Sequence, residues 1–104
     1  MTVDQTLRAV ADPTRRSVLQ LIEQGELPAG EIARHFPQMS RPAVSQHLRV
    51  LVDAGLLVVR SDGKKRLYRL RPGGLDEAAQ VFQSVWATRL ARLRLVAEEE
   101  ERRA

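Results

Sequence analysis

Residues 40–51 read SRPAVSQHLRVL, and this stretch has the pattern of a helix with one apolar face and one polar face. Ser40 is a residue type that caps helix N-termini, and Gly55 is typical of a helix end. On a wheel of 100° per residue, the apolar side chains fall on one side: Val44, Leu48, Leu51 and Val52. The opposite side carries Pro42, Gln46 and Arg49, with Ser45 on the flank. The stretch therefore predicts a helix over residues 41–54 that buries one face and offers a small polar face to solvent.

The chain before this helix predicts three shorter helices, over residues 3–10, 13–24 and 29–36. Asp12 followed by Pro13 is typical of an N-cap and the first residue of the second helix. Residues 26–28 are expected to be a short extended connector, and residues 37–40 a turn. The third and fourth helices then form a helix-turn-helix pair.

The chain after residue 54 predicts a β-hairpin followed by a long helix. Residues 56–60 and 66–71 have β-like patterns, and residues 61–65 between them contain Asp62-Gly63. This dipeptide is a strong hairpin signal because glycine accepts the positive φ that such turns need. After a break at residues 72–74, an apolar stripe continues at helical spacing to about Arg103. Such a helix is roughly 40 Å long, more than a globule of this size covers, so we expect part of the stripe to meet another subunit.

This order of elements is that of a winged helix-turn-helix, in which the second helix of the pair enters the major groove of DNA. The predicted fold is mainly α with a small two-stranded β-hairpin, and the 104 residues fit a single domain over residues 1–104. Within it, residues 1–71 form the DNA-binding core and wing. Residues 72–104 form a long C-terminal dimerisation helix.

The charge distribution supports a polyanionic partner. The net charge is +4, and residues 55–75 contain six basic side chains against Asp62 alone, while the rest of the chain is nearly balanced. Gln46 and Arg49 are candidates for base contacts, because glutamine and arginine read base edges bidentately. The helix start suits phosphate oxygens or base edges, and the hairpin tip suits the flanking backbone or minor groove. The candidate DNA-binding residues are Ser40, Arg41, Pro42, Ser45, Gln46, Arg49, Lys64, Lys65 and Arg66. Alternatively, the basic hairpin is a solvent-exposed surface without a binding role.

Several function classes are excluded by composition and spacing. The chain has no cysteine, hence no disulfide, thiolate nucleophile or cysteine-based metal site. No apolar run approaches the roughly 20 residues of a membrane span, and residues 1–10 lack the layout of a signal peptide, so we expect a cytoplasmic protein without membrane contact. Ser45 and His47 point about 200° apart on a helix and do not form a catalytic pair, so we expect no enzyme activity and no cofactor. His47 is expected to be a partly buried, hydrogen-bonded packing residue, and His35 an exposed one.

Five stretches resemble the ArsR/SmtB family of bacterial winged-helix repressors. They are Ala11-Asp12-Pro13-Thr14-Arg15-Arg16, Gly30-Glu31-Ile32-Ala33, residues 40–51, Ala54-Gly55-Leu56 and the hairpin with Gly63, Tyr68 and Leu70. The likeness covers about residues 5–71 and implies a homodimer, paired through the first and last helices, that occupies an operator. The candidate interface residues are Val3, Leu7, Phe82, Val85, Trp86, Leu90 and Leu93.

The chain departs from the metal-sensing members of that family. Those members carry Cys-x-Cys in the segment that here reads Glu26-Leu27-Pro28-Ala29-Gly30, and others carry histidine ligands on the last helix, whereas this chain has no histidine after His47. The chain therefore resembles the branch without a recognised metal site, in which a tryptophan such as Trp86 commonly occurs in the final helix. We expect no metal.

We expect the protein to be a homodimeric repressor that binds double-stranded DNA in a sequence-specific way. Its operator is expected to be pseudo-palindromic, and in such repressors it is often the operator of their own gene. A first alternative is a protein–protein interaction module that docks a partner on the last helix. Clustered wing charge and a polar face on residues 41–54 argue against it, since interaction surfaces favour aromatic anchors. A second alternative is a repressor gated by an unidentified small-molecule effector at the dimer interface.

Overall fold

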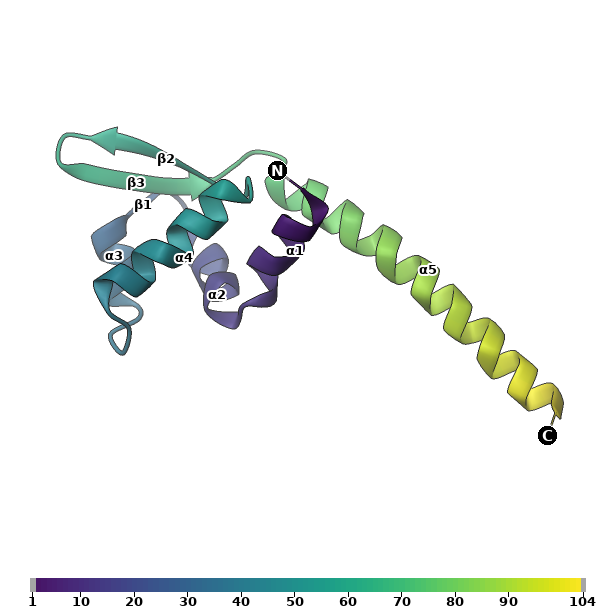
Figure 1. The fold of residues 1–104 in the computed structure, drawn as a ribbon. Helices are drawn as coiled ribbons and strands as arrows, with labels where there is room; N and C mark the ends of the chain where they lie inside the picture. The colour runs from purple at the N-terminus through teal and green to yellow at the C-terminus, as the bar shows by residue number, and fades with distance from the viewer. Residues whose placement is uncertain (1, 104) are drawn as a thin grey trace.

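The computed structural model describes residues 2–103 and shows a helical body, a small sheet and a long projecting helix (Figure 1). The elements are α1 (Val3–Ala11), α2 (Pro13–Ile22), β1 (Leu27–Pro28), α3 (Ala29–Arg34), α4 (Arg41–Asp53), β2 (Leu57–Asp62), β3 (Lys65–Leu70) and α5 (Gly74–Arg103). The predicted winged helix-turn-helix is confirmed in its order and class. Helix α3 ends earlier than the predicted Phe36.

Three helices begin at a side-chain cap. Thr2 Oγ1 accepts a hydrogen bond from the Gln5 amide at 3.1 Å, Asp12 Oδ1 accepts from the Arg15 amide at 3.1 Å, and Ser40 Oγ accepts from the Ala43 amide at 3.2 Å. Each bond satisfies one of the backbone N–H groups that have no partner within the first turn of a helix. The caps predicted at Asp12 and Ser40 are therefore confirmed.

The core lies between α2, α3, α4 and the start of β2. Its largest fully buried side chains are Val18, Ile22, Ile32, Leu48, Leu51, Leu56 and Leu57. The predicted apolar face of α4 supplies two of them, so burial of this face fixes which side of α4 remains in contact with solvent.

The sheet has three antiparallel strands in the order β1-β3-β2, one more than the two-stranded hairpin predicted from the sequence. The extra strand is the segment expected to be a connector. Leu27 pairs with Tyr68 and Pro28 with Leu67. A proline is tolerated here because β1 is an edge strand, where its missing N–H breaks no internal ladder.

The hairpin turn is tighter than predicted. Asp62 and Lys65 are direct cross-strand partners, so Gly63 and Lys64 alone form the turn. Gly63 has a φ of 62°, and no other residue type within residues 2–103 has a positive φ. Glycine at the first of two turn positions matches the type II′ pattern, whose twist suits the flanking strands. Lys64 consequently sits at the very tip, and Lys65 and Arg66 begin β3.

Helix α5 packs on the body only through its first turns. Leu75 and Ala78 are half-buried there, whereas every described residue from Phe82 onward is exposed. Figure 1 shows the remainder as an arm pointing away from the body, opposite the hairpin. The Cα radius of gyration is 18.2 Å, compared with about 13 Å for a compact chain of this length. The molecule is elongated, with extents of 67 × 29 × 22 Å.

Candidate nucleic-acid interface

The outward face of α4 is fully available to solvent. Its exposed residues are Arg41, Pro42, Ser45, Gln46, Arg49 and, at the end of the helix, Asp53, preceded by Ser40. Val44, Leu48 and Leu51 on the opposite face are buried against α2 and α3. The predicted division of the helix into two faces is confirmed. The Ser40 oxygen is engaged as the cap acceptor, but its O–H remains available as a donor to a phosphate.

The wing, which is the hairpin of β2 and β3, carries unpaired positive charge at its tip. Lys64, Lys65 and Arg66 are exposed, and within residues 2–103 none of them makes an ion pair. Asp62 is the cross-strand partner of Lys65 but forms no ion pair with it, so the three basic side chains remain available to a phosphate backbone.

Two other basic residues of the same segment are paired. Arg60 forms a bidentate bond with Glu26, with Nε at 2.9 Å from Oε2 and Nη2 at 2.7 Å from Oε1. This bond from Arg60 lowers the pKa of Glu26, although desolvation opposes the shift. Arg71 donates from Nε to Gly55 O at 2.6 Å and from Nη2 to Glu77 Oε2 at 2.8 Å. The six basic side chains counted in residues 55–75 are therefore not equivalent, because Arg60 and Arg71 form hydrogen bonds and ion pairs within the protein.

Helix α4 and the wing share one concavity. A groove between them is lined by Ala29, Ser45, Arg49, Val52, Val59, Arg66 and Tyr68. It brings Ser45 and Arg49 from the helix next to Arg66 from β3, so predicted base-contacting and backbone-contacting residues belong to one surface. Val59 was not singled out in the sequence, yet it is 40% exposed.

The two histidines lie as predicted. His47 is half-buried and its Nδ1 lies 3.3 Å from Arg15 Nη1. His35 is exposed, with Nδ1 3.0 Å from Glu31 O. Within residues 2–103, no three histidine, aspartate or glutamate side chains gather into a potential metal site.

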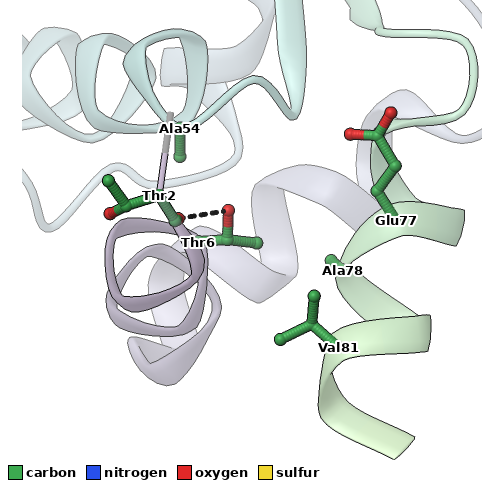
Figure 2. A pocket seen from close by; sticks show the side chains of 7 residues that line it. Thr2, Thr6, Ala54, Glu77, Ala78 and Val81 are labelled. Atoms are coloured by element: carbon green, nitrogen blue, oxygen red, sulfur yellow. Dashed lines mark hydrogen bonds between the residues drawn. The ribbon is translucent and has the colours of Figure 1, made fainter. Parts of the chain in front are cut away.

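A separate pocket lies where α1, α4 and α5 meet, away from the wing (Figure 2). It is lined by Thr2, Thr6, Ala54, Gly74, Glu77, Ala78 and Val81. Its polar groups are largely engaged, since the Thr6 hydroxyl donates to Thr2 O at 3.1 Å and Glu77 binds Arg71. The pocket thus lies at the contact between α5 and the body and is not part of the surface formed by α4 and the wing.

The candidate interface residues on α5 are solvent-exposed in the single chain. Phe82, Val85, Trp86, Leu90 and Leu93 are between 39% and 62% exposed. Leu95 and Val96, which are not among the predicted interface residues, are also exposed apolar residues. The Phe82 and Trp86 rings lie 5.6 Å apart. Leu7 on α1 is half-buried, and the side chain of Val3 lies outside the described part of the structure.

Comparison with known proteins gives a consistent result. A helix-turn-helix domain model matches residues 10–60. The arsenical resistance operon repressor of Staphylococcus aureus is 39% identical over 74 residues, covering 71% of this chain and 70% of the relative. This chain belongs to the ArsR/SmtB family of winged-helix transcriptional regulators.

Two further matches cover more of the chain. The HTH-type transcriptional regulator Rv2034 of Mycobacterium tuberculosis is 42% identical over 87 residues, covering 84% of this chain and 80% of the relative. A crystal structure described as a possible transcriptional regulator for arsenical resistance has a TM-score of 0.77 and 48% identity, covering 90% of this chain and 95% of that chain. As a member of this family, the chain is a DNA-binding transcriptional repressor, and the family consists of regulators rather than enzymes. None of the helices in the described part of the chain has an apolar stretch long enough to span a bilayer.

Proposed function

We propose that the protein is a homodimeric repressor in which each α4 enters a major groove of a pseudo-palindromic operator and each wing grips the flanking backbone. The observation that carries this proposal is the single surface formed by the polar face of α4 and the unpaired cations of the wing tip. A twofold dimer presents two such surfaces, so the half-sites lie about 10 to 10.5 bp apart or at a multiple of that spacing.

The residues of this surface have different roles. Gln46 and Arg49, in the second turn of α4 and beyond, read base edges. The residues at the helix start, Ser40, Arg41, Pro42 and Ser45, contact phosphates or nearby base edges. At the wing tip, Lys64, Lys65 and Arg66 bind the flanking backbone, where their contribution is sequence-independent.

The dimer contact is formed by α5 together with α1. Beyond Val81 every described residue of the helix is exposed, and isolated helices in water are only marginally stable. An exposed stripe that contains Phe82, Trp86 and Leu93 indicates a surface that a partner covers. We assign that partner to a second copy of the chain. Residues 72–104 thereby act as the dimerisation helix, and residues 1–71 as the DNA-binding core and wing.

Fluorescence anisotropy tests the DNA-binding proposal. The protein is titrated onto duplex DNA from upstream of its own gene and onto a scrambled duplex, between 50 and 300 mM salt. Binding at least ~10³-fold tighter to the upstream duplex is the expected result, since specific regulators exceed their non-specific affinity by that factor or more. Equal and steeply salt-dependent binding to both duplexes contradicts autoregulation from that site and favours the interaction-module alternative.

A further inference from the structure

Arg15 joins the C-terminus of α1 to the body of the protein. The last four carbonyls of a helix have no partner within it, and in α1 these belong to residues 8–11. Arg15 Nε donates to Ala9 O at 2.8 Å and Arg15 Nη2 donates to Arg8 O at 2.8 Å. Two of the four carbonyls are thus satisfied by one guanidinium, whose side chain is only 17% exposed.

The same guanidinium also reaches α4. Arg15 Nη1 lies 3.3 Å from His47 Nδ1 and 4.0 Å from Asp12 Oδ2. A guanidinium has only donors, so His47 Nδ1 is the acceptor in this contact. Arg15 therefore connects α1, the N-cap of α2 and the middle of α4 through one nearly buried group.

We propose that Arg15 is a positioning residue for operator recognition, acting through His47 to fix the orientation of α4 relative to α1. Arg15 itself lies on α2 and is not one of the residues proposed to contact DNA. The inference rests on the proposed function, because α1 belongs to the dimer contact there and α4 reads the operator. Within each subunit, the Arg15–His47 contact then links α1, which belongs to the proposed dimer contact, to α4, which enters the major groove.

Small rotations of α4 are sufficient to disrupt base reading. The helix has 13 residues and is about 20 Å long, so a rotation of roughly 10° moves its far end by about 3 Å. A shift of that size breaks hydrogen bonds to base edges, whose donor–acceptor distances span only a few tenths of an ångström. Long wing lysines follow the phosphate backbone through such a shift. Loss of the link therefore reduces operator affinity more than non-specific affinity.

Arg16 provides a matched control. Its Nη1 donates to Val10 O at 2.8 Å and to Ala11 O at 2.9 Å, which satisfies the other two carbonyls at the end of α1. Within residues 2–103, Arg16 makes no hydrogen bond to α4. Arg16→Gln thus removes as many capping bonds as Arg15→Gln while leaving the contact with α4 intact.

His47 provides a second pair of variants that leaves the cap of α1 untouched. His47→Leu removes the acceptor that Arg15 binds. His47→Asn keeps an acceptor oxygen near the position of Nδ1. This pair carries the test even where loss of Arg15 prevents folding.

The experiment measures operator and scrambled-duplex affinity by anisotropy, with urea unfolding followed in parallel. We expect Arg15→Gln and His47→Leu each to lose about tenfold in operator affinity with unchanged affinity for the scrambled duplex. Arg16→Gln and His47→Asn are expected to retain wild-type operator affinity. The Arg15→Gln/His47→Leu double variant should be no weaker than the weaker single variant, because both changes break one contact.

Three outcomes contradict the inference. Wild-type operator binding by both Arg15→Gln and His47→Leu shows that the contact does not position α4. Equal losses in Arg15→Gln and Arg16→Gln, with His47→Leu unaffected, show that only the cap of α1 matters. Failure of the wild-type protein to prefer any symmetric operator overturns the proposed function itself, and is recognised before any variant is compared.

Discussion

Asp12 illustrates how one carboxylate at the residue scale organises the turn between α1 and α2. The pKa of Asp12 lies below its ordinary value, chiefly because the Arg15 amide donates a hydrogen bond to the carboxylate. Desolvation of the carboxylate raises this pKa, whereas the positive charge of Arg15 lowers it further. Because the pKa in the folded state lies below that of the unfolded chain, Asp12 stabilises the fold above about pH 4. This contribution is lost as the pH falls through the folded pKa.

Asp12→Ala is expected to lower the free energy of unfolding by about 1 kcal/mol at pH 7, because the cap of α2 is lost. Asp12→Asn is expected to lose less, since asparagine is an equally preferred cap. Urea unfolding at pH 7 and near pH 3 measures both effects, and the gap between wild type and Asp12→Ala should narrow at the lower pH. A gap that widens on acidification would show that the sign of the pKa shift is wrong.

The different roles proposed for Arg49 and Lys64 predict different losses of DNA binding. Arg49→Ala is expected to cost roughly 1 to 3 kcal/mol on the operator and to relax the base preference at one position. Lys64→Ala is expected to weaken binding to all duplexes similarly and to reduce the salt slope by about one. Anisotropy with operator, single-base variants and scrambled duplex distinguishes them. Equal losses on operator and scrambled DNA for both variants would contradict the assignment of Arg49 to a base.

At the element scale, the sequence predicted those parts of the fold that depend on local pattern. The helix limits near Asp12 and Ser40 and the two faces of α4 follow from caps and a 3.6-residue period, which neighbouring residues encode. Strand β1 was missed because its two residues are too few to show an alternation. The Arg60–Glu26 pair joins residues 34 positions apart, and only the register of the sheet brings them together. The exposed residues of the candidate interface on α4 could therefore be predicted from the sequence. The sequence did not show that Arg60 and Arg71 are paired within the protein whereas Arg66 is not.

The junction between α4 and α5 predicts a strong effect of one added methyl group. A Cβ at Gly74 would lie 2.6 Å from Gly55 O and 3.5 Å from Leu56 Cα. Since the closest atom belongs to the backbone, it cannot rotate away, and Gly74→Ala is expected to lower the free energy of unfolding by about 1 to 3 kcal/mol.

Gly30→Ala is the matched control for this prediction. Its Cβ would meet only Arg41 Nη1, at 3.8 Å, and alanine is the better helix former. Gly30→Ala is expected to be neutral or to stabilise by up to about 1 kcal/mol in the same urea titration. Comparable destabilisation by both variants would show that the loss at Gly74 does not come from the contact with Gly55.

At the scale of the whole molecule, the elongated shape of the single chain fits the proposed dimer. The body buries its apolar residues among α2, α3, α4 and β2, while the 30-residue helix α5 carries a second apolar stripe that is exposed from Phe82 onward. Arg71 and the close approach of Gly74 fix the start of α5 to the end of α4. A dimer formed along α5 therefore transmits its geometry directly to the reading helices.

The proposed dimer predicts a response from Trp86, the one tryptophan in the sequence, which is 44% exposed in the single chain. Its emission is expected to shift to shorter wavelength as the protein concentration rises, because the partner helix removes it from water. Sedimentation measurements should show the monomer-to-dimer transition over the same concentration range. Emission that does not change while the protein dimerises would place the contact elsewhere than on the Trp86 face of α5.

Leu90→Glu places a negative charge within the apolar stripe of α5, and Ser84→Glu places the same charge outside it. Leu90 lies about 80° from Phe82 on the helical wheel and Ser84 about 200° from it, so only the first change buries a carboxylate in the proposed contact. Leu90→Glu is expected to be monomeric at micromolar concentration and to lose at least about 10²-fold in operator affinity, because a monomer holds only one half-site. Ser84→Glu should remain dimeric and bind as wild type. Retention of both dimer and operator binding by Leu90→Glu would exclude this face of α5 as the element that sets the spacing of the two reading helices.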